Sequence, residues 1–211
     1  MKLTPPLRKA TELGIALTAI ATLILAGCGG GGSSNAGTAV SNITTTVTPY
    51  KGMFTSGNVV LKDVNGNTIT LVTGGTIDTN GKAAVTFPAN VAFPITVEVS
   101  GTYIDETTGT SAVISAGSPL RGMIPATTDA NAASGVPVTA ITDLARATLP
   151  TTGFTAASAV AAITGAASNV LGVTSYAQAM LPPVFNTLGQ TSDANTLKLT
   201  ALAHVISQQG I

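Results

Sequence analysis

Cys28 is the only cysteine of the sequence and the residue whose chemistry is most specific. A thiolate is a strong nucleophile, so it can accept a covalent group. Leu25, Ala26 and Gly27 come directly before it, and small residues at the last two positions let an extended backbone fit a protease. A single cysteine allows no disulfide, so the fold must depend on its core. The pattern indicates a chain that is cut and modified at Cys28.

The residues before Cys28 have the order of a secretory leader. Residues 1–11 contain Lys2, Arg8 and Lys9, and residues 13–27 are apolar or small without any charge. A basic region followed by an apolar region is typical of an export signal. A bilayer-spanning helix needs about 20 apolar residues, and this run is shorter. The segment 1–27 is therefore predicted to be a signal peptide rather than a permanent transmembrane helix.

Leu25-Ala26-Gly27-Cys28 resembles the lipobox of the bacterial lipoproteins, which is Leu, a small residue, Gly or Ala, then Cys. The resemblance implies that signal peptidase II recognises Leu25, Ala26 and Gly27, and that the Cys28 thiol carries a diacylglyceryl group. Several acyl chains give stable attachment, whereas one chain binds a membrane only reversibly. The alternative is an ordinary signal peptide cut after Ala26 or Gly27.

The lipoprotein resemblance also implies a location. It predicts a lipid-anchored protein of the cell envelope. In a Gram-negative cell, Gly29 stands where this family places an aspartate for retention in the inner membrane, so the outer membrane is implied. The predicted partners are membrane lipid and an unknown envelope protein or surface ligand. After the leader, six basic residues accompany eight acidic ones, and this net charge of −2 does not favour nucleic acid.

Few residues after Cys28 carry catalytic chemistry. His204 is the only histidine, no Gly-x-Ser-x-Gly elbow exists, and a zinc site lacks His and Cys partners. Asp63-Val64-Asn65-Gly66-Asn67 spaces its oxygens like a calcium loop, but the twelfth position is Gly74 instead of Glu. A solvated turn is the preferred interpretation. We expect no catalytic residue, no metal and no cofactor.

A few acidic and aromatic residues leave open the alternative that the chain hydrolyses a sugar substrate. A pair of carboxylates for hydrolysis would have to come from Glu98, Asp105 or Glu106. Sugar stacking would depend on Tyr50, Tyr103 and Tyr176, because the chain has no Trp.

The sequence from Gly57 alternates with a period of two, which is typical of half-buried strands. Asn65-Gly66 predicts a hairpin turn, and Asn80-Gly81 predicts a second turn. Within 95–103 one face is expected to be buried and the other wet, which favours an antiparallel sheet. The wet residues would be Thr96, Glu98, Ser100 and Thr102, and the expected strands are 58–64, 68–73, 82–87, 95–103, 110–116 and 120–124.

These elements predict an α+β fold with a small antiparallel β-sandwich at 51–125. The segment 57–124 resembles the Ig-like, transthyretin-like or carboxypeptidase-regulatory-like modules of bacterial surfaces. Its hairpin, the strand end Gly101-Thr102-Tyr103 and the turn Asp105–Gly109 carry this resemblance. Residues 28–50 are interpreted as a flexible tether, in which 43–47 could also be a first strand, and 126–138 as a linker.

A helical subdomain is expected at 139–211. Its first helix would cover 139–149 and bury Ile141, Leu144, Ala145 and Leu149. Thr155 caps a second, alanine-rich helix that ends at Gly172, and a short helix is expected within 175–181. A last helix from residue 192 would bury Leu199, Leu202, Val205 and Ile206. Alanine buries little area, so this subdomain needs to pack on the sheets.

The preferred functional interpretation is a non-enzymatic, lipid-anchored envelope protein with a binding, structural or assembly role. The alternative is a lipid-anchored hydrolase, or the binding subunit of an envelope enzyme, whose carboxylates only folding brings together. A pocket with two carboxylates would favour that alternative. A third interpretation makes these residues the front part of a longer surface protein.

Overall fold

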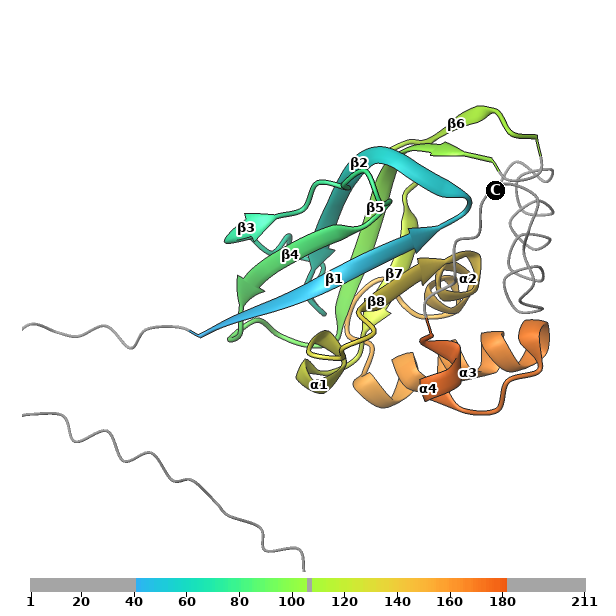
Figure 1. Cartoon of the computed structure of the whole chain (residues 1–211). Coiled ribbons are helices and arrows are strands. Elements are labelled where there is room, and N and C mark those ends of the chain that lie inside the picture. The colour runs from blue at the N-terminus through green and yellow to red at the C-terminus, as the bar shows by residue number, and fades with distance from the viewer. Residues whose placement is uncertain (1–40, 106–107, 182–211) are drawn as a thin grey trace, which may run out of the picture. The chain divides into compact units, whose positions relative to one another are not determined.

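A computed structural model describes residues 41–105 and 108–181 of the chain (Figure 1). The described residues form a mixed α+β structure with two β-sheets and short helices. The predicted leader, the lipobox and the predicted last helix lie outside the described residues.

The first sheet has the strand order β3-β4-β1-β8. Its strands are β1 (Asn42–Tyr50), β3 (Thr73–Gly74), β4 (Ala83–Pro88) and β8 (Val136–Thr139). Residues 43–47 thus form a strand, which decides between the two alternatives for that segment. β1 pairs antiparallel with β4 but parallel with β8. The antiparallel arrangement predicted from residues 95–103 is confirmed for the sheet that contains them, whereas the first sheet also contains this one parallel pair. The chain runs through the whole second sheet before β8, and so long a connection can return it in the direction of β1.

The second sheet is built around β5 (Ile95–Ile104). β2 (Met53–Lys62) pairs with one edge of β5 over nearly its whole length. β6 (Ser111–Ile114) and β7 (Leu120–Ile124) share the other edge, because β6 pairs with residues 101–104 and β7 with residues 95–99. The chain leaves the sheet edge between β6 and β7.

The turn at Asn65-Gly66 forms, but the predicted second strand of its hairpin does not. Only the first residues after the turn return to β2, where the Ile69 amide donates to the Leu61 carbonyl at 2.8 Å. The Val72 amide then donates to the Thr86 carbonyl of β4 at 2.7 Å. Residues 69–72 therefore cross from the second sheet to the first. Ile69 is buried in the core that the two sheets share, and this burial stabilises the crossing.

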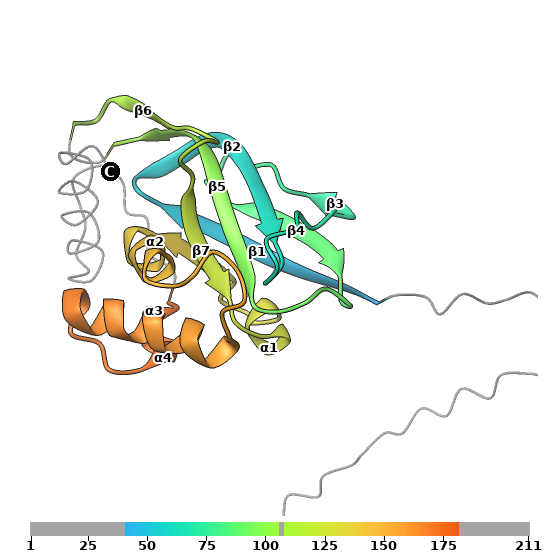
Figure 2. The same ribbon diagram turned by 180° about the vertical axis from the view of Figure 1, so that it is seen from behind.

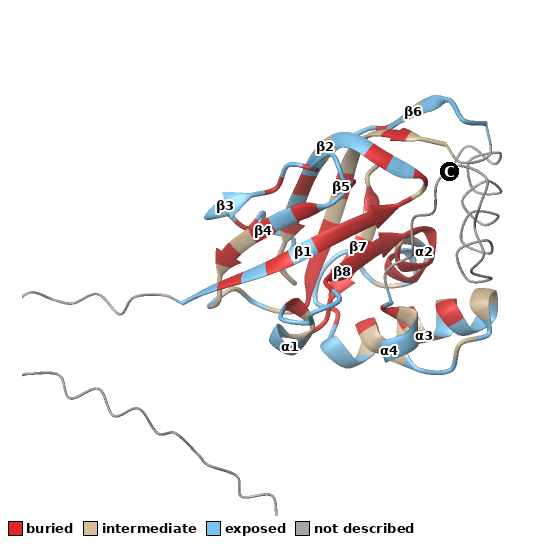
Figure 3. Ribbon diagram, in the orientation of Figure 1, coloured by how far each residue is buried: buried red, intermediate tan, exposed pale blue. Residues whose placement is uncertain are grey.

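The two sheets bury one common core. Val47, Val85 and Phe87 come from the first sheet, and Phe54 and Val97 from the second; all are fully buried (Figure 3). Alternation within β4 and β5 puts every second side chain into this core, as the sequence predicted. The arrangement is compatible with a small β-sandwich.

The helices are α1 (Thr127–Ala130), α2 (Ala140–Ala147), α3 (Ala156–Leu171) and α4 (Tyr176–Ala179). The predicted caps of α3 are confirmed: the Thr155 hydroxyl accepts from the Ser158 amide, and Gly172 ends α3 in the left-handed conformation. The Thr139 hydroxyl caps α2 in the same way, since it accepts from the Thr142 amide. Residues 126–138, expected to be a linker, instead contain α1 and the beginning of β8. α2 lies against β7 (Figure 2).

A second apolar cluster joins the helices to the outer face of the second sheet. Met123 of β7 is fully buried there, together with Phe154 and Ile163. The expectation that this face is wet was therefore wrong for Thr96, which is 5% exposed. The expected burial of Leu144 was also wrong, because α2 turns Ala145 and Arg146 toward the sheet and leaves Leu144 43% exposed. All described residues belong to one compact unit within Thr38–Ile211.

Candidate functional site

The residues of the predicted lipobox lie outside the described residues. Cys28 is the residue predicted to carry the lipid, and Leu25, Ala26 and Gly27 are those that signal peptidase II would recognise, so both assignments stay predictions. His204 and Glu106 also lie outside the described residues.

The calcium-like segment is a tight turn closed by its own aspartate. Asp63 Oδ1 accepts from the Asn65 and Asn67 amides at 2.9 and 2.8 Å, and Oδ2 accepts from Asn67 Nδ2 at 3.1 Å. Partial desolvation raises the pKa of Asp63, but these hydrogen bonds outweigh it and the net shift is downward. Asp78 closes the Asn80-Gly81 turn in the same way, accepting from the Asn80 and Lys82 amides. Both aspartates therefore shape turns.

The tyrosines on which sugar stacking would depend do not form a platform. Tyr50 and Tyr103 are 1% and 4% exposed, so their rings belong to the interior. Tyr176 packs partly buried beside Met123 and α3. Burial raises its pKa, and the neighbouring charge of Asp129 raises it further. No exposed aromatic surface arises from these residues.

A row of alternating charges crosses the outer face of the second sheet. Lys62 Nζ donates to Glu98 Oε1 at 2.9 Å, and Glu98 lies directly opposite Arg121 in the β5–β7 pairing. Arg121 Nε then donates to Asp143 Oδ1 of α2 at 2.7 Å. The sequence could not indicate this row, because strand pairing and helix docking bring its members together. Within this row, the Glu98 carboxylate is engaged in an ion pair with Lys62.

Arg146 is buried beside this row without an acidic partner among the described residues. Its guanidinium donates to Thr96 Oγ1 and to the backbone carbonyls of Leu149, Pro150 and Thr151 at 2.8 to 3.3 Å. It also lies over the Phe154 ring, 4.6 Å from the centroid. Burial lowers its pKa, and the neighbouring positive charge of Arg121 lowers it further. These contacts fasten the chain after α2 to β5.

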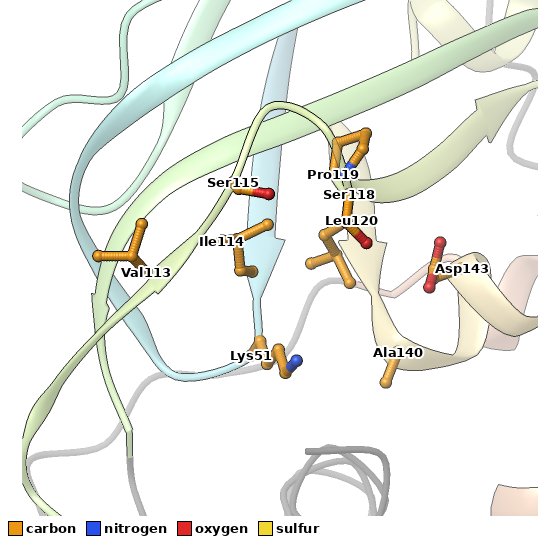
Figure 4. A pocket seen from close by; sticks show the side chains of 9 residues that line it. All are labelled: Lys51, Val113, Ile114, Ser115, Ser118, Pro119, Leu120, Ala140 and Asp143. Carbon is orange, nitrogen blue, oxygen red and sulfur yellow. The ribbon is translucent and has the colours of Figure 1, made fainter. Parts of the chain in front are cut away.

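A pocket of about 230 Å³ opens where β6 ends and β7 begins (Figure 4). One wall is the segment between these strands, another is the first turn of α2, and Lys51 of the β1–β2 turn closes a third side. The lining residues are Lys51, Val113, Ile114, Ser115, Ser118, Pro119, Leu120, Ala140 and Asp143. The pocket has a lysine, an aspartate and two hydroxyls around an apolar floor.

The polar groups of this pocket are unequally engaged. Asp143 Oδ1 accepts from both the backbone amide and Nε of Arg121, at 3.2 and 2.7 Å. The Lys51 ammonium makes no hydrogen bond or ion pair within the described residues, nor do the Ser115 and Ser118 hydroxyls. Sequence reasoning missed this site, because Lys51, Ser118 and Asp143 come from three separate elements.

The pocket holds one carboxylate instead of a pair. The other acidic side chains of the described residues accept hydrogen bonds elsewhere. They are Asp63 and Asp78 in turns, Glu98 beside Lys62, Asp105 at the Thr108 amide and Asp129 at the Ala126 amide. In the part that the structure describes, no group of three His, Cys, Asp or Glu side chains gathers in a metal-binding arrangement. The pocket therefore offers a ligand the charged groups of Lys51 and Asp143 and the hydroxyls of Ser115 and Ser118.

Comparison with known proteins adds no relative to this description. No family model, no curated protein and no solved structure matches the chain. Within the described residues, no helix combines the length and the hydropathy that crossing a bilayer requires.

Proposed function

We propose that this chain is a lipid-anchored lipoprotein of the cell envelope whose α+β unit has a non-catalytic binding role. Cys28 would hold the protein at the membrane through its lipid, and residues between Cys28 and β1 would act as a short tether. In a Gram-negative cell the anchor would be in the outer membrane. The leader and lipobox support the location in the envelope. The hydrogen bonds and ion pairs of the acidic residues support the non-catalytic role.

The observation that carries the non-catalytic role is how the described carboxylates are used. An acid–base pair made of two carboxyl groups needs both groups to face one substrate, in environments that separate their pKa values. Asp63, Asp78 and Asp129 instead accept backbone amide hydrogens, and Glu98 and Asp143 pair with cations. No observation among the described residues favours the hydrolase alternative.

We also propose that the two sheets form an Ig-like or transthyretin-like sandwich of the kind that displays binding surfaces. The common core between the sheets supports this assignment. The parallel β1–β8 pair and the helices on the outer face of the second sheet would be additions to such a module.

Replacing Cys28 by Ser tests the anchor. The wild-type chain should fractionate with membranes and incorporate radiolabelled palmitate. Cys28→Ser should lose the label and appear in the soluble envelope fraction, because a hydroxyl does not accept the diacylglyceryl group. Inhibiting signal peptidase II should make the wild-type chain accumulate as an uncut precursor.

Ser33→Ala in the predicted tether is the matched control, since it removes a hydroxyl close to Cys28 and leaves the lipobox unchanged. It should fractionate like the wild type. Membrane association and palmitate label that persist in Cys28→Ser would overturn the proposed anchor.

A further inference from the structure

We propose that the pocket between Lys51 and Asp143 binds a small carboxylate that also carries hydroxyl groups, such as a sugar acid of monosaccharide size. This assignment names the ligand class for the binding role proposed above and rests on that role. It is independent of the lipid anchor.

The charges of the pocket favour an anion. Arg121 Nε neutralises Asp143 at 2.7 Å, so the remaining formal charge among the lining residues is the Lys51 ammonium. Lys62 is different, because it already pairs with Glu98 at 2.9 Å. An ammonium without a partner among the described residues, at the side of a concave surface, is well placed for a carboxylate. Such charge-assisted hydrogen bonds are about twice as strong as neutral ones.

The remaining polar atoms favour a ligand with hydroxyl groups. Asp143 uses Oδ1 for Arg121, while Oδ2 makes no hydrogen bond within the described residues. An ionised carboxylate only accepts, so a ligand must supply an O–H at this position. The Ser115 and Ser118 hydroxyls can donate and accept. All of these residues line the same pocket, and Figure 4 shows them around Ile114 and Leu120.

The volume of the pocket and the residues that line it narrow the class of ligand further. Pockets for drug-sized ligands have volumes of roughly 300–1,000 Å³, so a pocket of about 230 Å³ fits a smaller molecule. The lining contains no aromatic ring, so a neutral sugar would lack the stacking surface that commonly binds it. The apolar floor can cover the C–H face of a ring, while Lys51 supplies the specificity for an acid.

Glucuronate is the probe, with glucose and acetate as its neutral and hydroxyl-free counterparts. The full-length mature protein in detergent is titrated with each compound and followed by amide chemical shifts in NMR. Glucuronate should shift the signals of residues 114–120 and 140–143 saturably. Glucose and acetate should each bind at least about tenfold more weakly, because each lacks one of the two recognised groups.

Two lysine variants make the decisive comparison. Lys51→Gln should weaken glucuronate binding by about tenfold or more and leave glucose unchanged. Lys82→Gln is the matched control, because Lys82 is exposed at the turn before β4 and does not line the pocket; it should bind like the wild type. Equal thermal midpoints of the two variants would show that folding is intact.

The proposal fails if glucuronate causes no saturable shifts, if glucose binds as tightly as glucuronate, or if Lys51→Gln titrates like Lys82→Gln. Failure here leaves the fractionation of Cys28→Ser unaffected, so it is distinguishable from failure of the anchor. Saturable binding that Lys51→Gln abolishes would establish the site.

Discussion

At the scale of single residues, Arg146 shows how this chain uses a charge to hold its backbone. Its guanidinium binds three carbonyls that follow α2 and one hydroxyl of β5, and it is only 6% exposed. The planar guanidinium of arginine has five N–H donors that point in different directions, so it can bind several acceptors at once. The compact ammonium of a lysine could not reach the same set. Removing the side chain would leave the buried Thr96 hydroxyl and three partly buried carbonyls without this donor.

Arg146→Ala should lower the free energy of unfolding by about 3 kcal/mol, the usual range for breaking a buried charged network. Arg146→Lys should recover little of this loss. Arg121→Ala is the comparison and should cost about 1 kcal/mol or less, because the Arg121–Asp143 pair is partly exposed. Urea denaturation of the three variants gives the values. Equal losses for Arg146→Ala and Arg121→Ala would contradict the structural role.

At the scale of elements, two facing glycines let β2 and β5 approach closely. Gly57 and Gly101 are register partners, next to an irregularity in the pairing between Phe54 and Ser56. A Cβ on Gly101 would lie 2.2 Å from the Ser56 carbonyl oxygen, and the residue has a φ of +150°. Gly165 in α3 is the opposite case, because a Cβ there meets nothing within 4 Å.

Alanine at these two glycines should have opposite effects. Gly101→Ala should destabilise the protein by on the order of 3 kcal/mol or prevent folding, because the backbone must shift and strain is added. Gly165→Ala should stabilise it by about 0.5–1 kcal/mol through helix propensity. Thermal melts followed by circular dichroism measure both. A neutral Gly101→Ala would show that the β2–β5 approach is wider than described.

At the scale of the whole molecule, the second sheet is covered on both faces. One face packs on the first sheet, and the other packs on α2 and α3 through Met123, Phe154 and Ile163. Alanine-rich helices bury little area each, so this joint surface supplies the stability that α3 would lack by itself. Helices and sheets should therefore unfold together.

Ile163→Ala should lower the free energy of unfolding by about 2–5 kcal/mol, since Ile163 is fully buried. The loss should move the helical signal and the signal of the sheet tyrosines, Tyr50 and Tyr103, to the same lower midpoint. Asn169→Ala, exposed on α3, should change stability by less than about 0.5 kcal/mol. Helical signal lost well before the tyrosine signal would indicate two independent units.

The sequence by itself determined the features that depend on neighbouring residues. Thr155 caps α3 and Gly172 ends it as expected, because a cap depends on a few adjacent backbone groups. The alternation of Ala83, Val85 and Phe87 likewise predicted one buried face of β4. The signal peptide and lipobox are also read from adjacent residues, and they stay predictions.

Tertiary structure alone decided which distant segments meet. The parallel return of β8 to β1, the crossing of the chain after Ile69 and the burial of Thr96 under Arg146 have no periodic signal in the sequence. The candidate site belongs to this second kind. Lys51, Ser118 and Asp143 form one pocket only because β1, the β6–β7 segment and α2 pack together, and local propensity does not encode such packing.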